Sequence, residues 1–289
     1  MIKESNMIDI AHFPKDREDI VRLWGACFGD ARHYIEFFLD NLPSENVLFV
    51  YKIEGNIAGM FFLMPANFRY KTEESIQKQK IQPVFYVYAV GVAPEYRKNG
   101  IAGKMLEFAK EYAAREGAEL CLVPANDALG SYYANRGFKK VSATNSPKYI
   151  NEALMDKIVS KTSDMIKIDT VQNIYLLDKY IDALYNKRVE ALGNVDALVW
   201  DINNFRFALI EHLYTGGSIY IDDNVGDTGD IEYVIARVGQ NGTFVREAVV
   251  SEADGIISAS GNCAMITYMS YGNEVINDAY DKYINFCFD

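Results

Sequence analysis

Residues 90–102 read VGVAPEYRKNGIA and contain the pattern Arg-x-x-Gly-x-Ala, formed by Arg97, Gly100 and Ala102. A glycine lets backbone N–H groups face a ligand, and the first turn of a helix offers N–H groups that have no partner within the helix. A small residue lets a pyrophosphate approach closely, and Arg97 and Lys98 add positive charge. Together with the helix dipole, these features predict a phosphate-binding turn.

The residues on either side of this turn predict alternating strands and helices. Val84–Val92 is typical of a strand, and Ile101–Glu116 is typical of a helix that ends before Gly117. Glu119–Val123 predicts another strand, Asp127–Arg136 a short helix, and Phe138–Val141 the start of a further strand. This order favours an α/β sheet with a ligand site at a strand-to-helix junction.

The N-terminal part of the chain predicts two helices and a strand hairpin. The helices are Asp16–Phe28 and Tyr34–Leu42, and the strands are Val47–Ile53 and Ile57–Met64, joined at Glu54-Gly55-Asn56. The polar stretch Lys71–Gln82 predicts an exposed connection.

A chain of 289 residues is long enough for two domains. We expect a first domain at 1–145, a linker or inter-domain helix at 146–164, and a second, smaller α/β domain at 165–289. Met165–Ile168 followed by the helical pattern Ile174–Tyr185 weakly repeats Met7–Ile10 followed by Ile20–Phe28. The second domain should also contain a helix at Phe205–Tyr214, strands at Ser218–Ile221, Glu232–Val238 and Thr243–Val250, and a final helix or strand at Val275–Phe288.

Composition limits the classes of function. The net charge is -11: residues 1–150 carry 19 basic and 18 acidic side chains, and residues 151–289 carry 10 and 22. An acidic second half repels nucleic acid and attracts cations, although a solubilising surface is an equally good interpretation. The N-terminal residues show no signal-peptide pattern, no apolar run is long enough for a bilayer, and the four cysteines lack metal-ligand spacing. We therefore expect a cytoplasmic protein with free thiols, no metal, no membrane contact and no nucleic-acid partner.

The turn and a second motif resemble the acetyl-CoA-binding region of the GNAT superfamily of N-acetyltransferases. The second motif is Asn126 followed by Tyr132-Tyr133-Ala134-Asn135-Arg136-Gly137-Phe138, and the resemblance covers about residues 7–145. It implies the GNAT fold, a mixed central sheet with flanking helices, followed here by a second domain that is also GNAT-like but lacks the turn. A Rossmann-like nucleotide site is disfavoured because no acidic ribose-binding residue is suitably placed.

The resemblance also implies how acetyl-CoA, the co-substrate, is held. The strand before the turn would separate from its neighbour at a bulge, and a main-chain N–H near Val90–Val92 would polarise the thioester carbonyl. The residues implied to bind acetyl-CoA are Val90, Gly91, Val92, Arg97, Lys98, Asn99, Gly100, Ile101, Ala102, Gly103, Asn126 and Tyr133. Asn126 could instead be an ordinary turn residue.

Tyr133 matches the tyrosine that the family places near the sulfur, which implies a general acid for the leaving thiolate; a packing residue is the alternative. The strand Val84–Val90 has no Glu or His to act as a base, but Tyr86 and Tyr88 share one face and could line the acceptor pocket or pack in the core. A closer resemblance rests on Leu122-Val123-Pro124-Ala125 followed by Tyr132-Tyr133 and Gly137-Phe138, together with a second GNAT-like unit. In these features the chain resembles the enhanced-intracellular-survival (Eis) group, in which the C-terminal carboxylate is the base. That resemblance makes Asp289 a candidate base, although this chain is shorter than that group's members.

The predicted function is transfer of an acetyl group from acetyl-CoA to a primary amine, either a small molecule or a peptidyl amine, and homo-oligomers are compatible with it. One alternative is a non-catalytic acyl-CoA-binding or sensing module. Another is an aminoacyl transferase that uses charged tRNA, which the acidic second half and the intact turn both disfavour.

Overall fold

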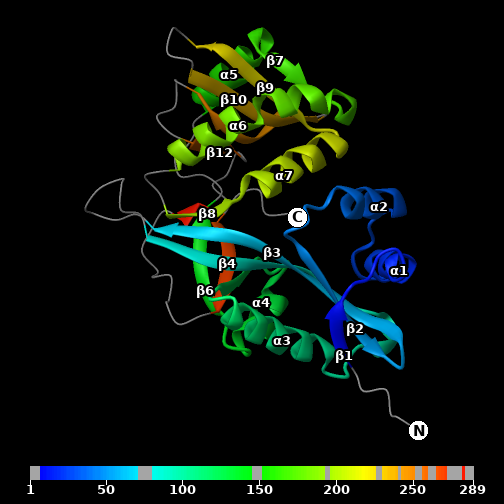
Figure 1. The fold of residues 1–289 in the computed structure, drawn as a ribbon. Coiled ribbons are helices and arrows are strands. Elements are labelled where there is room, and N and C mark those ends of the chain that lie inside the picture. The colour runs from blue at the N-terminus through cyan, green and yellow to red at the C-terminus, as the bar shows by residue number, and fades with distance from the viewer. Residues whose placement is uncertain are drawn as a thin grey trace. The chain divides into compact units, whose positions relative to one another are not determined.

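The structure is a computed structural model, and it describes residues 7–70, 80–144, 152–192, 196–225, 230–239, 242–250, 256–259, 265–271 and 282–283. The chain forms two compact units (Figure 1). Unit 1 comprises Met1–Ala66, Gln82–Val141 and Tyr268–Asn277, and unit 2 comprises Asn67–Ile81, Ser142–Thr267 and Asp278–Asp289.

Unit 1 is built on a mixed sheet with the strand order β1-β2-β3-β4-β5-β13-β6. The strands are β1 (Met7–Ile10), β2 (Val47–Ile53), β3 (Asn56–Tyr70), β4 (Lys80–Val92), β5 (Glu119–Leu122), β6 (Lys139–Thr144) and β13 (Met265–Tyr271). The helices are α1 (Arg17–Phe28), α2 (Arg32–Asn41), α3 (Ile101–Arg115) and α4 (Asp127–Ala134), with a short 3₁₀ turn at Pro94–Tyr96. β4 and β5 run parallel, whereas β1–β2, β2–β3 and β5–β13 are antiparallel. The predicted fold class, a mixed sheet flanked by helices, is confirmed.

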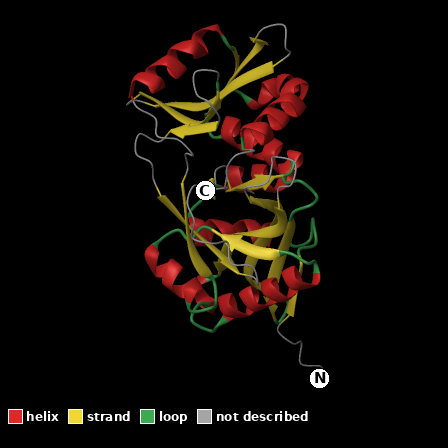
Figure 2. Cartoon of the chain, turned by 90° about the vertical axis from the view of Figure 1, so that its left-hand side faces the viewer, coloured by secondary structure: helices red, strands yellow, loops and turns green. Residues whose placement is uncertain are grey.

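Helices cover both faces of this sheet because successive strand residues point to opposite sides (Figures 1 and 2). Phe61 of β3 lies in the core cluster with Leu106 and other buried residues of α3. The next residue, Phe62, faces the other way and packs its ring against Trp24 of α1 and Phe38 of α2. The alternating pattern therefore fixes which helix covers which face.

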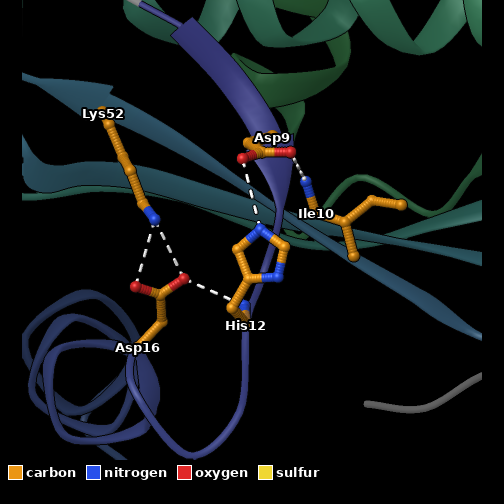
Figure 3. A network of polar contacts seen from close by, with 5 residues as sticks. All are labelled: Asp9, Ile10, His12, Asp16 and Lys52. Atoms are coloured by element: carbon orange, nitrogen blue, oxygen red, sulfur yellow. Dashed lines mark hydrogen bonds and ion pairs between the residues drawn. The ribbon is translucent and has the colours of Figure 1, made fainter.

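A network of polar contacts joins β1 to α1 and β2, as Figure 3 shows. Lys52 Nζ donates to both carboxylate oxygens of Asp16, at 3.1 and 2.9 Å, and the His12 N–H donates to Asp16 Oδ2 at 2.9 Å. Burial raises the pKa of Asp16, but the His12 N–H and the Lys52 ammonium outweigh it and lower the pKa below its ordinary value. Asp9 Oδ1 accepts from the Ile10 N–H at 2.9 Å, so the side chain satisfies a donor of the edge strand β1.

The structure divides the chain differently from the sequence-based boundaries, which assigned everything after residue 165 to the second domain. Strand β13 pairs with β5 in the sheet of unit 1, with Met269 opposite Leu122 and Tyr271 opposite Leu120. The segment Ser142–Thr267 of unit 2 begins before the predicted linker, and part of that linker is the helix α5 (Glu152–Lys161). Each unit therefore consists of three separate segments of the chain.

Unit 2 contains an antiparallel sheet with the strand order β12-β11-β10-β9-β7. Its elements are α5, β7 (Ile166–Ile168), α6 (Ile174–Ala191), β8 (Asp196–Trp200), α7 (Ile202–Tyr214), β9 (Ser218–Val225), β10 (Asp230–Gly239), β11 (Gly242–Val249), β12 (Ile256–Ala259) and β14 (Lys282–Tyr283), the last of which pairs parallel with β8. Most of the predicted helices and strands are present, but β8 and β12 were not predicted. The predicted final element at Val275–Phe288 lies outside the described residues except for β14.

Two buried polar groups organise the core of unit 2. The fully buried Arg188 donates through Nε to Glu247 at 3.0 Å, and the Tyr233 hydroxyl donates to the same carboxylate at 2.8 Å. The ring of His212 is also buried, with Nε2 3.0 Å from the carbonyl oxygen of Ala236. Burial lowers the pKa of His212 to about 4, so the ring is neutral at physiological pH.

Candidate functional site

The strand before the turn separates from its parallel neighbour partway along its length. The register between β4 and β5 pairs Val84 with Glu119, Phe85 with Leu120 and Tyr86 with Cys121, and it extends no further within the described residues. Three residues later Ala89 has φ 50°, a left-handed conformation that a residue with a Cβ adopts at some cost. β4 nevertheless continues to Val92, so its last residues pass a place where β5 no longer pairs with them.

The other edge of β4 stays attached to β3. The Ala93 N–H donates to the Ala58 carbonyl at 3.0 Å. Main-chain groups of successive strand residues point alternately to the two sides, so the N–H groups of Val90 and Val92 point away from β3. These two donors therefore lie on the side where the strands separate, and a bulge in β4 stays a prediction.

The turn that follows presents the start of helix α3 to solvent. Gly100 is the N-cap residue of α3 with φ 74°, and a Cβ added to it would meet no atom within 4 Å. Lys98 is also left-handed, with φ 66°. The first helical hydrogen bond runs from the Lys104 N–H to the Gly100 carbonyl at 3.1 Å, so the N–H groups of residues 101–103 have no acceptor within the helix. No acidic residue occupies the first turn, which leaves the positive end of the dipole uncompensated there.

The side chains of the turn are partly used to hold its shape. Arg97 Nε donates to the Val92 carbonyl at 3.0 Å, and the Cys27 thiol of α1 donates to the same oxygen at 3.4 Å. Asn99 Nδ2 donates to the Tyr96 carbonyl at 3.3 Å. Lys98 is exposed. Arg97 therefore fastens the turn to the end of β4, a role that the sequence did not indicate.

Arg136 is a cation at this site that the sequence analysis did not single out. Its Nε and Nη2 atoms lie 3.6 and 3.7 Å from the position of a Cβ on Gly103, in the first turn of α3. Its guanidinium carbon lies 3.5 Å from the ring centroid of Tyr132, and Nη1 donates to the Tyr132 carbonyl at 2.9 Å. A cation held beside the positive end of a helix is electrostatically unfavourable unless an anion lies between them.

Tyr133 lies on α4 and is buried, with 8% of its surface exposed. Its ring meets Phe138 at a centroid distance of 5.7 Å and Tyr132 at 5.5 Å. Burial, with a smaller contribution from Tyr132, raises the pKa of Tyr133 to about 12, so the phenol is protonated at any physiological pH. The structure thus shows packing contacts for Tyr133, and its role as an acid stays a prediction.

Asn126 is the N-cap residue of α4, and its Oδ1 accepts from the Leu129 N–H at 3.0 Å. That bond is what the turn-residue alternative expects, and a contact with the pantetheine arm stays a prediction. Tyr86 is buried and Tyr88 half-buried, and their rings stack at 6.4 Å. Tyr88 also stacks on Phe38 at 5.7 Å, so both tyrosines belong to the aromatic cluster under α1 and α2. The candidate base Asp289 lies outside the described residues.

No group of His, Cys, Asp and Glu that could hold a metal ion occurs among the described residues. Cys27 and Cys121 are free thiols, and Cys263 and Cys287 lie outside the described ranges. Within the same ranges, every helix is too short or too polar to cross a bilayer.

Comparison with known proteins gives a family-model match and a set of solved structures. Residues 13–141 match the family model described as an acetyltransferase (GNAT) domain. No curated protein matches the chain.

Solved structures with the same fold include two GCN5-related N-acetyltransferases. The one from Anabaena variabilis ATCC 29413 has a TM-score of 0.60 and 14% identity, over 91% of this chain and 72% of that one. The one from Kribbella flavida has a TM-score of 0.55 and 10% identity, over 92% of this chain and 71% of that one. The GNAT family N-acetyltransferase YhbS from Escherichia coli, described in complex with CoA, matches 46% of this chain and 68% of its own, with a TM-score of 0.35 and 16% identity. The domain match and the fold together support an acyltransferase.

Proposed function

We propose that the chain transfers the acetyl group of acetyl-CoA to a primary amine. The observation that carries the proposal is the pairing of two features in one GNAT domain: β4 leaves β5 after Tyr86, and α3 begins at an open, left-handed Gly100. The first feature provides free main-chain donors, and the second provides an anion site. Acetyl-CoA needs both, because it joins a thioester to a pyrophosphate through a long arm.

The N–H groups at the start of α3 would bind the pyrophosphate oxygens, as the dipole and the missing acidic residues favour. Lys98 adds positive charge at the turn. Arg136 supplies a second cation from the turn that follows α4, and its stacking on Tyr132 holds the guanidinium in place. Arg97 would act by holding the turn through the Val92 carbonyl.

The donors that the bulge leaves on β4 would act on the other end of the molecule. The N–H groups of Val90 and Val92 point away from β3, so either could donate to the thioester carbonyl and stabilise the negative charge that develops on its oxygen. Gly91 lets β4 pack tightly against the end of α1, because a Cβ at this position would lie only 3.1 Å from Cys27 Sγ and 3.3 Å from Phe28 Cε2.

The leaving thiolate would accept a hydrogen bond from the Tyr133 hydroxyl, which stays protonated because of its raised pKa. No carboxylate or imidazole occurs between Phe85 and Val90 on β4. The attacking amine would therefore bind as the neutral base or lose its proton to water.

The first experiment is acetyl-CoA binding, measured by calorimetry and thermal shift, on the wild type and two glycine variants. Gly100→Glu puts bulk and negative charge where the pyrophosphate should lie. Gly117→Glu is the matched control, since Gly117 has φ 67°, equally open space and a position at the opposite end of α3. Each change should cost about 1–2 kcal/mol of left-handed strain, so only the effect on binding separates them.

We expect micromolar binding by the wild type and Gly117→Glu, and none by Gly100→Glu. Release of CoA thiol with a panel of primary amines then tests transfer. Failure of the wild type to bind acetyl-CoA would refute the proposal. Binding without transfer to any amine would favour the acyl-CoA-binding module instead.

A further inference from the structure

The connection between α1 and α2 holds a carboxylate in a fixed position. Gly29 ends α1 with φ 81°, and Asp30 follows it. Trp24 Nε1 donates to Asp30 Oδ2 at 2.7 Å, and the Trp24 side chain is fully buried. The half-buried carboxylate is therefore oriented by a rigid indole rather than by a flexible partner.

The same residues connect Asp30 to the part of β4 where the thioester is proposed to lie. Phe28 is two residues before Asp30, and its Cε2 lies 3.3 Å from the Cβ position of Gly91. The Trp24 ring meets Tyr88 of β4 at 6.1 Å and Phe28 at 6.3 Å. Phe28 is 44% exposed, which is unusual for a large apolar side chain packed against a strand.

Nearby cations are engaged by other carboxylates. Arg32, two residues after Asp30, is bound by Glu18 at 2.6 Å and Glu36 at 2.8 Å. On α1, Arg17 pairs with Asp40 and Arg22 pairs with Asp19, each at 2.7 Å. Asp30 makes no ion pair with any residue in the described part of the chain, so its carboxylate remains available to a ligand, and the ring of Phe28, two residues before it, is partly exposed.

We propose that Asp30 binds a second ammonium group of the acceptor, which makes the substrate a diamine or polyamine rather than a simple amine. The inference rests on the proposed function. The reacting nitrogen must be neutral to attack the thioester, so the charged group that Asp30 holds is a different nitrogen on the same molecule. A carboxylate and adjacent aromatic rings together suit an alkylammonium ion.

Asp30 could instead serve only to fasten the turn through Trp24. Asp30→Asn separates the two roles, because the amide oxygen can still accept from the indole while the charge is lost. Asp19→Asn is the matched control: it removes a carboxylate from α1 that is already paired with Arg22.

The test compares a series of diaminoalkanes with the aminoalcohols of equal chain length, using CoA thiol release at fixed acetyl-CoA. For the wild type and Asp19→Asn we expect kcat/KM to favour the diamine by roughly tenfold to a hundredfold. Asp30→Asn should abolish that preference through KM, with kcat and the calorimetric Kd for acetyl-CoA unchanged.

A wild type that treats diamine and aminoalcohol alike would overturn the inference and leave the proposed function intact. An Asp30→Asn variant that keeps the preference for the diamine would also overturn the inference. So would a variant whose kcat/KM falls equally for both acceptors while its melting temperature also falls. A wild type that acetylates other primary amines but neither of these compounds would overturn the inference alone. A wild type that binds acetyl-CoA but acetylates no primary amine would reject the proposed function, and the inference with it.

Discussion

Replacing Tyr133 with Phe tests how the proposed reaction handles the leaving thiolate. Burial raises the pKa of Tyr133 to about 12, and a free thiol titrates near about 8.5. Complete proton transfer from the phenol to the thiolate would therefore be unfavourable by about 5 kcal/mol. A hydrogen bond from the neutral phenol to the thiolate needs no such transfer and contributes about 1.5–3 kcal/mol.

The Tyr133→Phe variant should lose only that hydrogen bond, so kcat should fall by roughly tenfold to a hundredfold. The ring contacts with Phe138 and Tyr132 are kept, and the Kd for acetyl-CoA should not change. Because the phenol stays protonated up to about pH 12, the wild-type rate should show no falling limb from this group between pH 6 and 10.

The assay is CoA thiol release under saturating acetyl-CoA across that pH range, with Tyr132→Phe as the control. Tyr132 is the neighbouring phenol, half-buried with its ring against Arg136, and its loss should leave kcat nearly unchanged. An unchanged kcat in Tyr133→Phe would show that the residue only packs. A loss beyond about a thousandfold, with a pH limb that disappears in the variant, would show that the phenol transfers its proton fully and that the argument from its pKa is wrong.

Two further predictions concern stability, both measured by urea unfolding. A Cβ on Gly217 would lie 2.1 Å from His212 Nε2, so Gly217→Ala should lower the free energy of unfolding by about 1–3 kcal/mol. His212→Ala removes the obstructing ring, so the double variant should be less destabilised than the sum of the two single variants. Additive effects of the two substitutions would refute this explanation. Lys52→Met should cost about 2–4 kcal/mol at pH 7 by leaving the Asp16 carboxylate buried without its cation. Because the pKa of Asp16 is lowered in the folded protein, its stabilising effect is present above its ordinary pKa of 3.8 and is lost as pH falls through the folded value. The destabilisation caused by Lys52→Met should therefore shrink as the pH falls below 3.8. A destabilisation that does not depend on pH would contradict this role.

Local patterns predicted the helices and the turn well where neighbouring residues determine the structure. The helix at Asp16–Phe28 is α1 with Asp16 as its N-cap residue, and the turn before Ile101 has its glycine in the left-handed conformation that only glycine adopts easily. The positive φ of Ala89 could not be read from the sequence, because alanine carries no signal for that conformation. The bulge was expected there only because Gly91 lies in a strand and because of the family resemblance.

Long-range contacts were out of reach of such patterns. Strand β13 pairs with β5 from more than a hundred residues away, and nothing in Met265–Tyr271 itself identifies the partner. Arg136 was missed for the same reason, because it lies beside the first turn of a helix that precedes it in the chain. Asp30 is held by an indole only six residues before it, but nothing in the sequence shows that the Trp24 side chain points towards it.

The topology of unit 2 bears on whether it could hold a second acetyl-CoA. Its order β7, α6, α7, β9, β10 and β11 follows that of β1, α1, α2, β2, β3 and β4, apart from the additional β8, which supports the weak repeat found in the sequence. The two units differ at the next step. In unit 1 the helix α3 carries the chain from β4 to a parallel strand, whereas only residues 250–255 separate β11 from β12.

A parallel connection needs a dozen or more residues, and β12 accordingly pairs antiparallel with β11, with Val249 opposite Ile256. Between these two strands there is then no room for a helix whose N-terminus could bind a pyrophosphate, and no parallel pair that could separate around a pantetheine arm. That unit 2 holds no second acetyl-CoA site stays a prediction, and it rests on the length of one connection as well as on the missing Arg-x-x-Gly pattern.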